Sequence, residues 1–134
     1  MPAPAVDRLD HIVLTVEDIE ATCDFYSRVL GMKVERFVPP AGGRERVALH
    51  FGLNKINLHK RGSEFKPHAR APNSGTGDFC MITSMPIAQA AAHVKSCGVI
   101  IEEGPVKRAG ARGSITSIYF RDPDGNLLEL SNYD

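Results

Sequence analysis

The sequence predicts an α+β fold made of two modules with the same order of elements, strand–helix–strand–strand–strand (βαβββ). The order predicted for residues 8–61 recurs in residues 77–133, at an offset of 67 residues, which is half of the 134-residue chain. A segment rich in proline, glycine and serine, residues 62–76, separates the two halves and is typical of a linker. A chain of this length buries one core, which favours a single domain spanning residues 1–134.

The first module begins with a predicted strand at 9–16, LDHIVLTV, which is rich in branched residues. Apolar residues at helical spacing follow in 18–31, where Asp18 is placed to cap the helix and Gly31 to end it. Three further strands are predicted at 32–38, 46–51 and 55–60.

The second module repeats this order. DFCMIT (78–83) is predicted to be a strand, and 86–98 a helix with Ser84 as its N-cap and Pro86 in its first turn. Three strands are then predicted at 99–103, 114–120 and 126–131. Few residues are identical between the halves, so a chance match of two strand–helix units is the alternative. The matched order, the matched lengths and the central linker favour a duplication.

Composition excludes several classes of protein. Sixteen basic and sixteen acidic residues leave no net charge, so a nucleic-acid partner is not indicated. No apolar run reaches membrane-spanning length, and the first ten residues lack the layout of a signal peptide. The three cysteines form no CxxC pair, which argues against a zinc ribbon or a disulfide framework. These features predict a cytoplasmic protein with reduced thiols and no membrane partner.

Glu129 is a charged residue between leucines in a predicted core strand, within RDPDGNLLELSN (121–132). Side chains on a strand alternate between two faces, so the leucines would pack beneath the helices while Glu129 faces away. The same alternation turns His11 and the repeat-equivalent Asp78 away from the helices. If the two sheets curve toward each other, one cavity receives five polar side chains, namely His11, Asn57, His59, Asp78 and Glu129.

Imidazole and carboxylate groups around a partly enclosed site are what a divalent metal ion needs, and open positions would remain for a substrate. Other interpretations of these residues stay open. His11 could be an ordinary strand-end histidine paired with Asp10, Glu129 could be exposed on an edge strand, and Asp78 could cap the turn after Gly77. The metal hypothesis is favoured because the three residues share one face and two are equivalent in the repeat.

Four segments resemble the vicinal oxygen chelate superfamily, which comprises glyoxalases, fosfomycin-resistance and bleomycin-resistance proteins and ring-cleavage dioxygenases. The segments are LDHIVLTVEDIEATCDFYSRVLGMKV, INLH, CGVIIEEGPV and SIYFRDPDGNLLELSN. The similarity covers nearly the whole chain and is greatest to the glyoxalase-domain-containing protein 5 or virulence-associated glyoxalase-like branch, in which INLH and the next loop correspond to 56–69. The resemblance implies that the paired modules form a cup-shaped open barrel around a metal ion.

The resemblance also implies the roles of site residues, because family ligands come from the first and fourth strands of each module. His11, Asp78 and Glu129 would hold a divalent ion, which could be Mn, Fe, Ni or Zn. Asp78 replaces the usual histidine, and Asn57 replaces a glutamate of glyoxalase I. His59 lies two residues beyond Asn57, about 7 Å along the strand, so both would line the substrate pocket. Glu129 and His59 are then the candidate catalytic residues.

The leading functional hypothesis is a metal-dependent enzyme of the glyoxalase type, acting on a small molecule that chelates the metal through vicinal oxygens. The nearest named chemistry is the isomerisation catalysed by lactoylglutathione lyase. Three alternatives stay open: a thiol transferase of the fosfomycin-resistance type, an extradiol dioxygenase, and a non-catalytic drug-binding protein like those of bleomycin resistance. The open cup and its strand edges also predict a homodimer, with sites that can lie at the interface.

Overall fold

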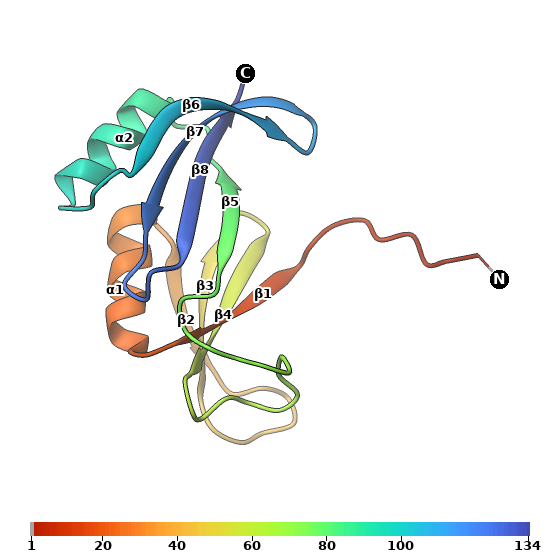
Figure 1. The fold of residues 1–134 in the computed structure, drawn as a ribbon. Helices are drawn as coiled ribbons and strands as arrows, with labels where there is room; N and C mark the ends of the chain where they lie inside the picture. The colour runs from red at the N-terminus through yellow and green to blue at the C-terminus, as the bar shows by residue number, and fades with distance from the viewer. Residues whose placement is uncertain (1) are drawn as a thin grey trace.

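The computed structural model describes residues 2–134, and its elements form two βαβββ modules (Figure 1). The first comprises β1 (His11–Val16), α1 (Ile19–Leu30), β2 (Lys33–Phe37), β3 (Arg46–Phe51) and β4 (Asn54–Lys60). The second comprises β5 (Asp78–Ile82), α2 (Ile87–Ser96), β6 (Glu103–Gly110), β7 (Gly113–Arg121) and β8 (Leu127–Tyr133). The predicted α+β fold with two such modules is therefore confirmed.

Each module forms a four-stranded sheet with the same topology. The strand orders are β1-β4-β3-β2 in the first sheet and β5-β8-β7-β6 in the second. The first and last strands of each module pair in parallel, and the other pairs are antiparallel. The two sheets do not close into a barrel, and β1 and β5 are outer strands of their sheets. Neither helix in residues 2–134 is long and apolar enough to cross a membrane.

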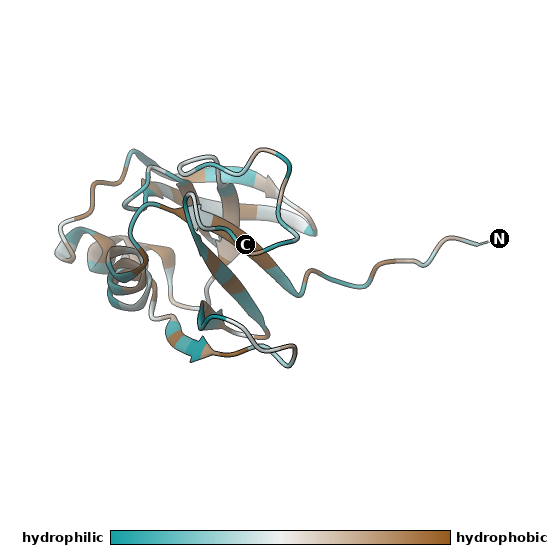
Figure 2. Ribbon diagram, turned by 90° about the horizontal axis from the view of Figure 1, so that it is seen from below, coloured by the Kyte–Doolittle hydropathy of each residue, from teal (hydrophilic) through white to brown (hydrophobic). Residues whose placement is uncertain are grey.

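Helix α1 has the ends that the sequence predicts. The Asp18 side chain accepts a hydrogen bond from the backbone N–H of Ala21 at 3.0 Å, and Gly31 ends the helix in the left-handed conformation with φ 65°. Phe25 and Tyr26 on this helix are buried in the core between the helices and the sheets. Along the strands, hydrophobic and hydrophilic residues alternate (Figure 2), and both sheets contribute hydrophobic residues to this core.

Helix α2 begins differently from the prediction, and Ser84 is not its N-cap. Pro86 occupies the cap position and supplies no side-chain hydrogen bond. The first N–H group, that of Ile87, instead donates to Oδ1 of Asn132 at 2.7 Å. The acceptor comes from β8, which is distant in sequence, so no local pattern could have identified it.

The strand predicted at 99–103 is also wrong, because β6 begins only at Glu103. Val99 and Ile101 pack against the core from an irregular segment, whereas Ile100 between them is exposed. That alternation resembles a strand, yet the pairing with β7 begins at residue 103, preceded by a single bond from the Glu102 N–H to the Tyr119 carbonyl oxygen at 2.8 Å.

The turn at RDPDGN joins the modules. Asp122 is buried, and its Oδ2 accepts hydrogen bonds at 2.7 Å from the Tyr26 hydroxyl of α1 and from the Asn126 amide. Asn126 Oδ1 in turn accepts from the backbone N–H of Gly77, just before β5. Burial and the neighbouring Asp122 carboxylate raise the pKa of Tyr26, which keeps its hydroxyl protonated as a donor. The turn therefore fixes α1, the end of the linker and β8 together.

Replacing Tyr26 with phenylalanine will lower the free energy of unfolding by about 1–3 kcal/mol, because it removes a buried hydrogen bond to a charged acceptor. Urea unfolding measures this loss. Tyr133→Phe is the control, since the Tyr133 hydroxyl accepts only a 3.2 Å bond from the exposed Arg112 backbone and its loss should cost less than about 0.5 kcal/mol. Equal losses in the two variants would contradict the role of Tyr26 between the modules.

Candidate functional site

The face of the first sheet that points away from the helices carries polar side chains. In the parallel pair of β1 and β4, His11 lies opposite Lys55, Val13 opposite Asn57, and Thr15 opposite His59. The intervening residues of β4 are fully buried on the helix side. We call this side of each sheet the polar face, which in the first sheet carries His11, Thr15, Asn57 and His59.

The second sheet has the corresponding polar face. Asp78 lies opposite Leu127, and Cys80 opposite Glu129, in the parallel pair of β5 and β8. The relation of Cys80 to Glu129 matches that of Val13 to Asn57, so Glu129 and Asn57 occupy equivalent positions in the two modules. Asp78 and His11 are the first residues of equivalent strands. The polar face of the second sheet carries Asp78, Cys80, Glu129 and Ser131.

His11 has the surroundings of a histidine that can bind a metal. Its Nδ1 lies 2.8 Å from Oδ2 of Asp10, and this hydrogen bond lowers the pKa of Asp10. A carboxylate on one ring nitrogen fixes the orientation of the imidazole and leaves Nε2 free, as in many metal-binding histidines. The pair with Asp10 is the one that the sequence suggested as an alternative role. The Asp10–His11 hydrogen bond is compatible with a metal-binding histidine and with an ordinary strand-end histidine.

Glu129 is held by hydroxyl groups on its polar face. Its Oε2 accepts from Ser117 Oγ at 2.6 Å, and Ser117 Oγ lies 2.7 Å from Ser131 Oγ, which lies 3.3 Å from Cys80 Sγ. Each hydroxyl has one proton, so the donors run from Cys80 through Ser131 and Ser117 to Glu129. One carboxylate oxygen is thereby oriented, and Glu129 also lies opposite Tyr119 of β7. Sequence reasoning missed Ser117, although strand alternation places it on this face.

His59 is 6% exposed and lies edge-on to the ring of Phe65, with 5.4 Å between ring centres. Burial and the positive charge of Arg46 lower its pKa, so the imidazole is neutral at pH 7. Within residues 2–134, Nδ1 of His59 and Oδ1 of Asn57 are buried without a hydrogen-bond partner. A ligand or water that binds between these two positions of β4 would satisfy both atoms.

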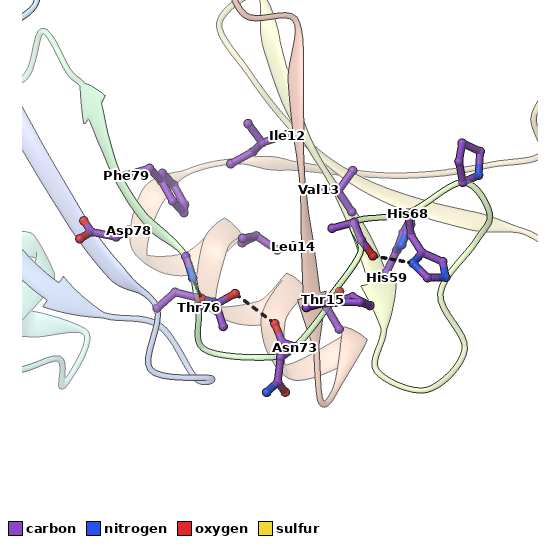
Figure 3. Close-up of a pocket in the computed structure, with 16 residues that line it drawn as sticks. Ile12, Val13, Leu14, Thr15, His59, His68, Asn73, Thr76, Asp78 and Phe79 are labelled. Carbon is purple, nitrogen blue, oxygen red and sulfur yellow. Dashed lines mark hydrogen bonds between the residues drawn. The ribbon is translucent and has the colours of Figure 1, made fainter.

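A pocket of about 400 Å³ lies beside these residues, between β1, the start of β5 and the linker (Figure 3). Thr15 and His59 line it from the first sheet, and Asp78 from the second. His68 and Asn73 line it from the linker, where His68 Nδ1 lies 2.8 Å from the Ala69 carbonyl oxygen. The pocket therefore unites His59 with Asp78, but neither His11 nor Glu129 lines it.

The three residues that the sequence predicts as metal ligands do not converge within one chain. In the described part, residues 2–134, no group of three His, Cys, Asp or Glu side chains is close enough to hold one ion. His11, Asp78 and Glu129 thus share the polar faces of the two modules without forming a common centre in the single chain.

A family model described as "Glyoxalase/Bleomycin resistance protein/Dioxygenase superfamily" matches residues 8–130. The virulence protein STM3117 of Salmonella typhimurium is 50% identical over 128 residues, covering 96% of this chain and 85% of that protein. The solved structure of an integron cassette protein from V. cholerae is 52% identical, with a TM-score of 0.92, covering 98% of this chain and 99% of the other. Lactoylglutathione lyase GLX1 of Arabidopsis thaliana is 29% identical over 127 residues, covering 92% of this chain and 43% of that protein.

Proposed function

The chain belongs to the glyoxalase/bleomycin resistance protein/dioxygenase superfamily, and from this we propose that it is a metal-dependent enzyme of the glyoxalase type. Its substrate would be a small molecule with two neighbouring oxygen atoms. The observation that carries the proposal is the equivalence of the polar faces, on which His11 corresponds to Asp78 and Asn57 to Glu129. The similarity to a lactoylglutathione lyase makes an isomerisation of that type the nearest chemistry.

In this proposal His11, Asp78 and Glu129 hold a divalent ion, which can be Mn, Fe, Ni or Zn. The donor set fits, because nitrogen and carboxylate oxygen ligands suit these ions. Asp10 leaves Nε2 of His11 free, and Ser117 orients the Glu129 carboxylate. A bound ion would supply Lewis-acid stabilisation of an oxyanion formed on the substrate.

We propose that the site is completed in a homodimer, by the first module of one chain and the second module of its partner. Two observations support this. The candidate ligands of residues 2–134 do not converge in one chain, although each lies on a polar face. The outer strands β1 and β5 also expose apolar side chains, Val13 at 46% and Ile82 at 54%, and such edges are normally covered.

In this proposal the protein's own side chains carry out the proton transfer. Neutral His59, with Nδ1 unpartnered, is suited to accept a proton from the substrate carbon and return it to the neighbouring carbon. Glu129, whose Oε2 is held by Ser117, is the second candidate base. Asn57 cannot act as a base, but its side-chain amide can hold a substrate oxygen or hydroxyl. The proton is conserved in this isomerisation, which needs no co-reactant.

Metal binding tests the proposal. Wild-type protein that has been stripped with a chelator and reloaded with Mn, Fe, Ni or Zn should retain one of these ions and isomerise the hemithioacetal of methylglyoxal and glutathione. His11→Ala should lose the ion, because it removes the nitrogen ligand. His93→Ala is the control, since His93 lies on α2 with its Nε2 3.2 Å from the Arg28 carbonyl oxygen. Metal content by mass spectrometry decides, and equal metal in both variants, or none in the wild type, would contradict the proposal.

A further inference from the structure

Two arginines share one aromatic ring next to His59. The guanidinium carbon of Arg44 lies 4.2 Å from the centre of the Phe65 ring, and that of Arg46 lies 4.1 Å from it. Arg46 belongs to β3, whereas Phe65 belongs to the linker that follows β4. The ring therefore holds two like charges, from different segments, beside His59.

These charges have no carboxylate partner. In residues 2–134, neither Arg44 nor Arg46 forms an ion pair, although ten other ion pairs are present. Arg44 donates only to the Ser63 carbonyl oxygen at 2.9 Å, and the Nε group of Arg46 is buried without any acceptor. A buried N–H of a charged group without an acceptor is costly, and a bound anion would remove that cost.

The cluster adjoins the site described above. Arg46 stands next to the strand pair Val47–Leu58, beside His59, and after burial its charge is the next cause that lowers the pKa of His59. Glu64 is the one carboxylate that raises the pKa of His59, and it is engaged by the backbone N–H of Gly62 at 3.0 Å. His59 therefore lines the pocket and also contacts the ring that carries the two unpaired arginines, although neither arginine lines the pocket itself.

We propose that Arg44 and Arg46, next to His59, bind an oxyanion of the substrate, namely a carboxylate or a phosphoryl group. The proposal rests on the function proposed above and deepens it, because it assigns an acidic substrate to the site. Guanidinium groups present parallel N–H donors that match a carboxylate or phosphate, and stacking on Phe65 pre-arranges them. Phe65 thus acts as a positioning residue that the linker brings to the two arginines.

Binding of inorganic phosphate, with acetate as the carboxylate probe, tests the subsite in the stripped protein without substrate. Titration at constant ionic strength, followed by the imidazole NMR signals, should shift His59 but not His93. Arg46→Gln and Arg44→Gln should each weaken binding about tenfold or more, because each removes a charge-assisted hydrogen bond. The tighter of the two probes identifies the class of oxyanion.

The matched control is Arg112→Gln, since Arg112 also stacks on a ring, that of Tyr133 at 4.8 Å, but in the second sheet. Arg112→Gln should leave phosphate affinity unchanged. Arg46→Lys should retain part of the affinity, because lysine keeps the charge but lacks the paired N–H donors of a guanidinium group. If Arg46→Gln lowers the melting temperature, its weaker binding could reflect a damaged fold. Arg44→Gln then decides, because Arg44 is exposed. Affinity that is unaffected by either glutamine substitution, or that falls equally in Arg112→Gln, overturns the inference.

The two proposals fail independently. Metal binding and turnover together with phosphate binding that ignores Arg44 and Arg46 would remove the oxyanion subsite and keep the enzyme. Arginine-dependent phosphate binding in a protein without metal or turnover would keep the subsite and remove the proposed function.

Discussion

Mixing His11→Ala chains with Glu129→Gln chains will restore metal-dependent turnover that neither variant has alone. If each site takes His11 from one chain and Glu129 from its partner, a mixed dimer contains one site with both native residues and one site with neither. Random exchange of chains in a symmetric dimer should then recover about a quarter of the wild-type activity. The physical reason is that the ligand candidates lie on separate polar faces and do not converge among residues 2–134.

The control uses two variants of the same module. Asp78→Ala and Glu129→Gln both alter the second module, so their mixed dimer has one lesion in each site and should stay inactive. His11→Ala with Asp78→Ala should recover activity as the first mixture does. The chains are denatured and refolded together, and light scattering establishes that dimers form. Mixed dimers without recovered activity in either complementing pair would place the complete site within one chain.

Strand alternation was enough to predict which residues share the polar faces. Leu128 and Leu130 bracket Glu129, so the face of the carboxylate followed from its neighbours, and the structure has them as predicted. The pattern could not give the distance between the two sheets, because alternation fixes a face and not a separation. The sequence therefore suggested one cavity for all the polar residues, whereas the pocket contains His59 and Asp78 without Glu129.

Contacts made by irregular segments were beyond the sequence patterns. Phe65 has no periodicity that marks it as a partner of His59, yet it accounts for part of the burial of that histidine. The predicted cap Ser84 failed for the same reason, since the acceptor at the start of α2 is Asn132 of β8. Helix α1 was predicted correctly at both ends because its cap and its terminal glycine are local.

Replacing His59 with alanine will leave metal content unchanged and lower kcat/KM about 10²- to 10⁴-fold, the usual contribution of a general base. His59 is buried, neutral and unpartnered at Nδ1, whereas the candidate ligands lie on other positions of the polar faces. His50→Ala is the control, because the His50 imidazole lies 3.1 Å from Glu35 on the neighbouring strand and away from the pocket. Loss of metal in His59→Ala would instead make His59 a ligand and favour the two-histidine arrangement of a dioxygenase.

The pH dependence of kcat/KM is a second test of His59 as the general base. A base must be neutral, so kcat/KM should be high above the pKa of His59 and fall as the pH drops through it. Because burial and Arg46 lower that pKa from 6.5, the acidic limb should lie below pH 6.5. Arg46→Gln removes a charge that opposes protonation and should move the limb to higher pH. Glu64→Gln removes a charge that favours protonation and should move it to lower pH. A limb that stays in place in both variants would assign the titrating base to a residue other than His59.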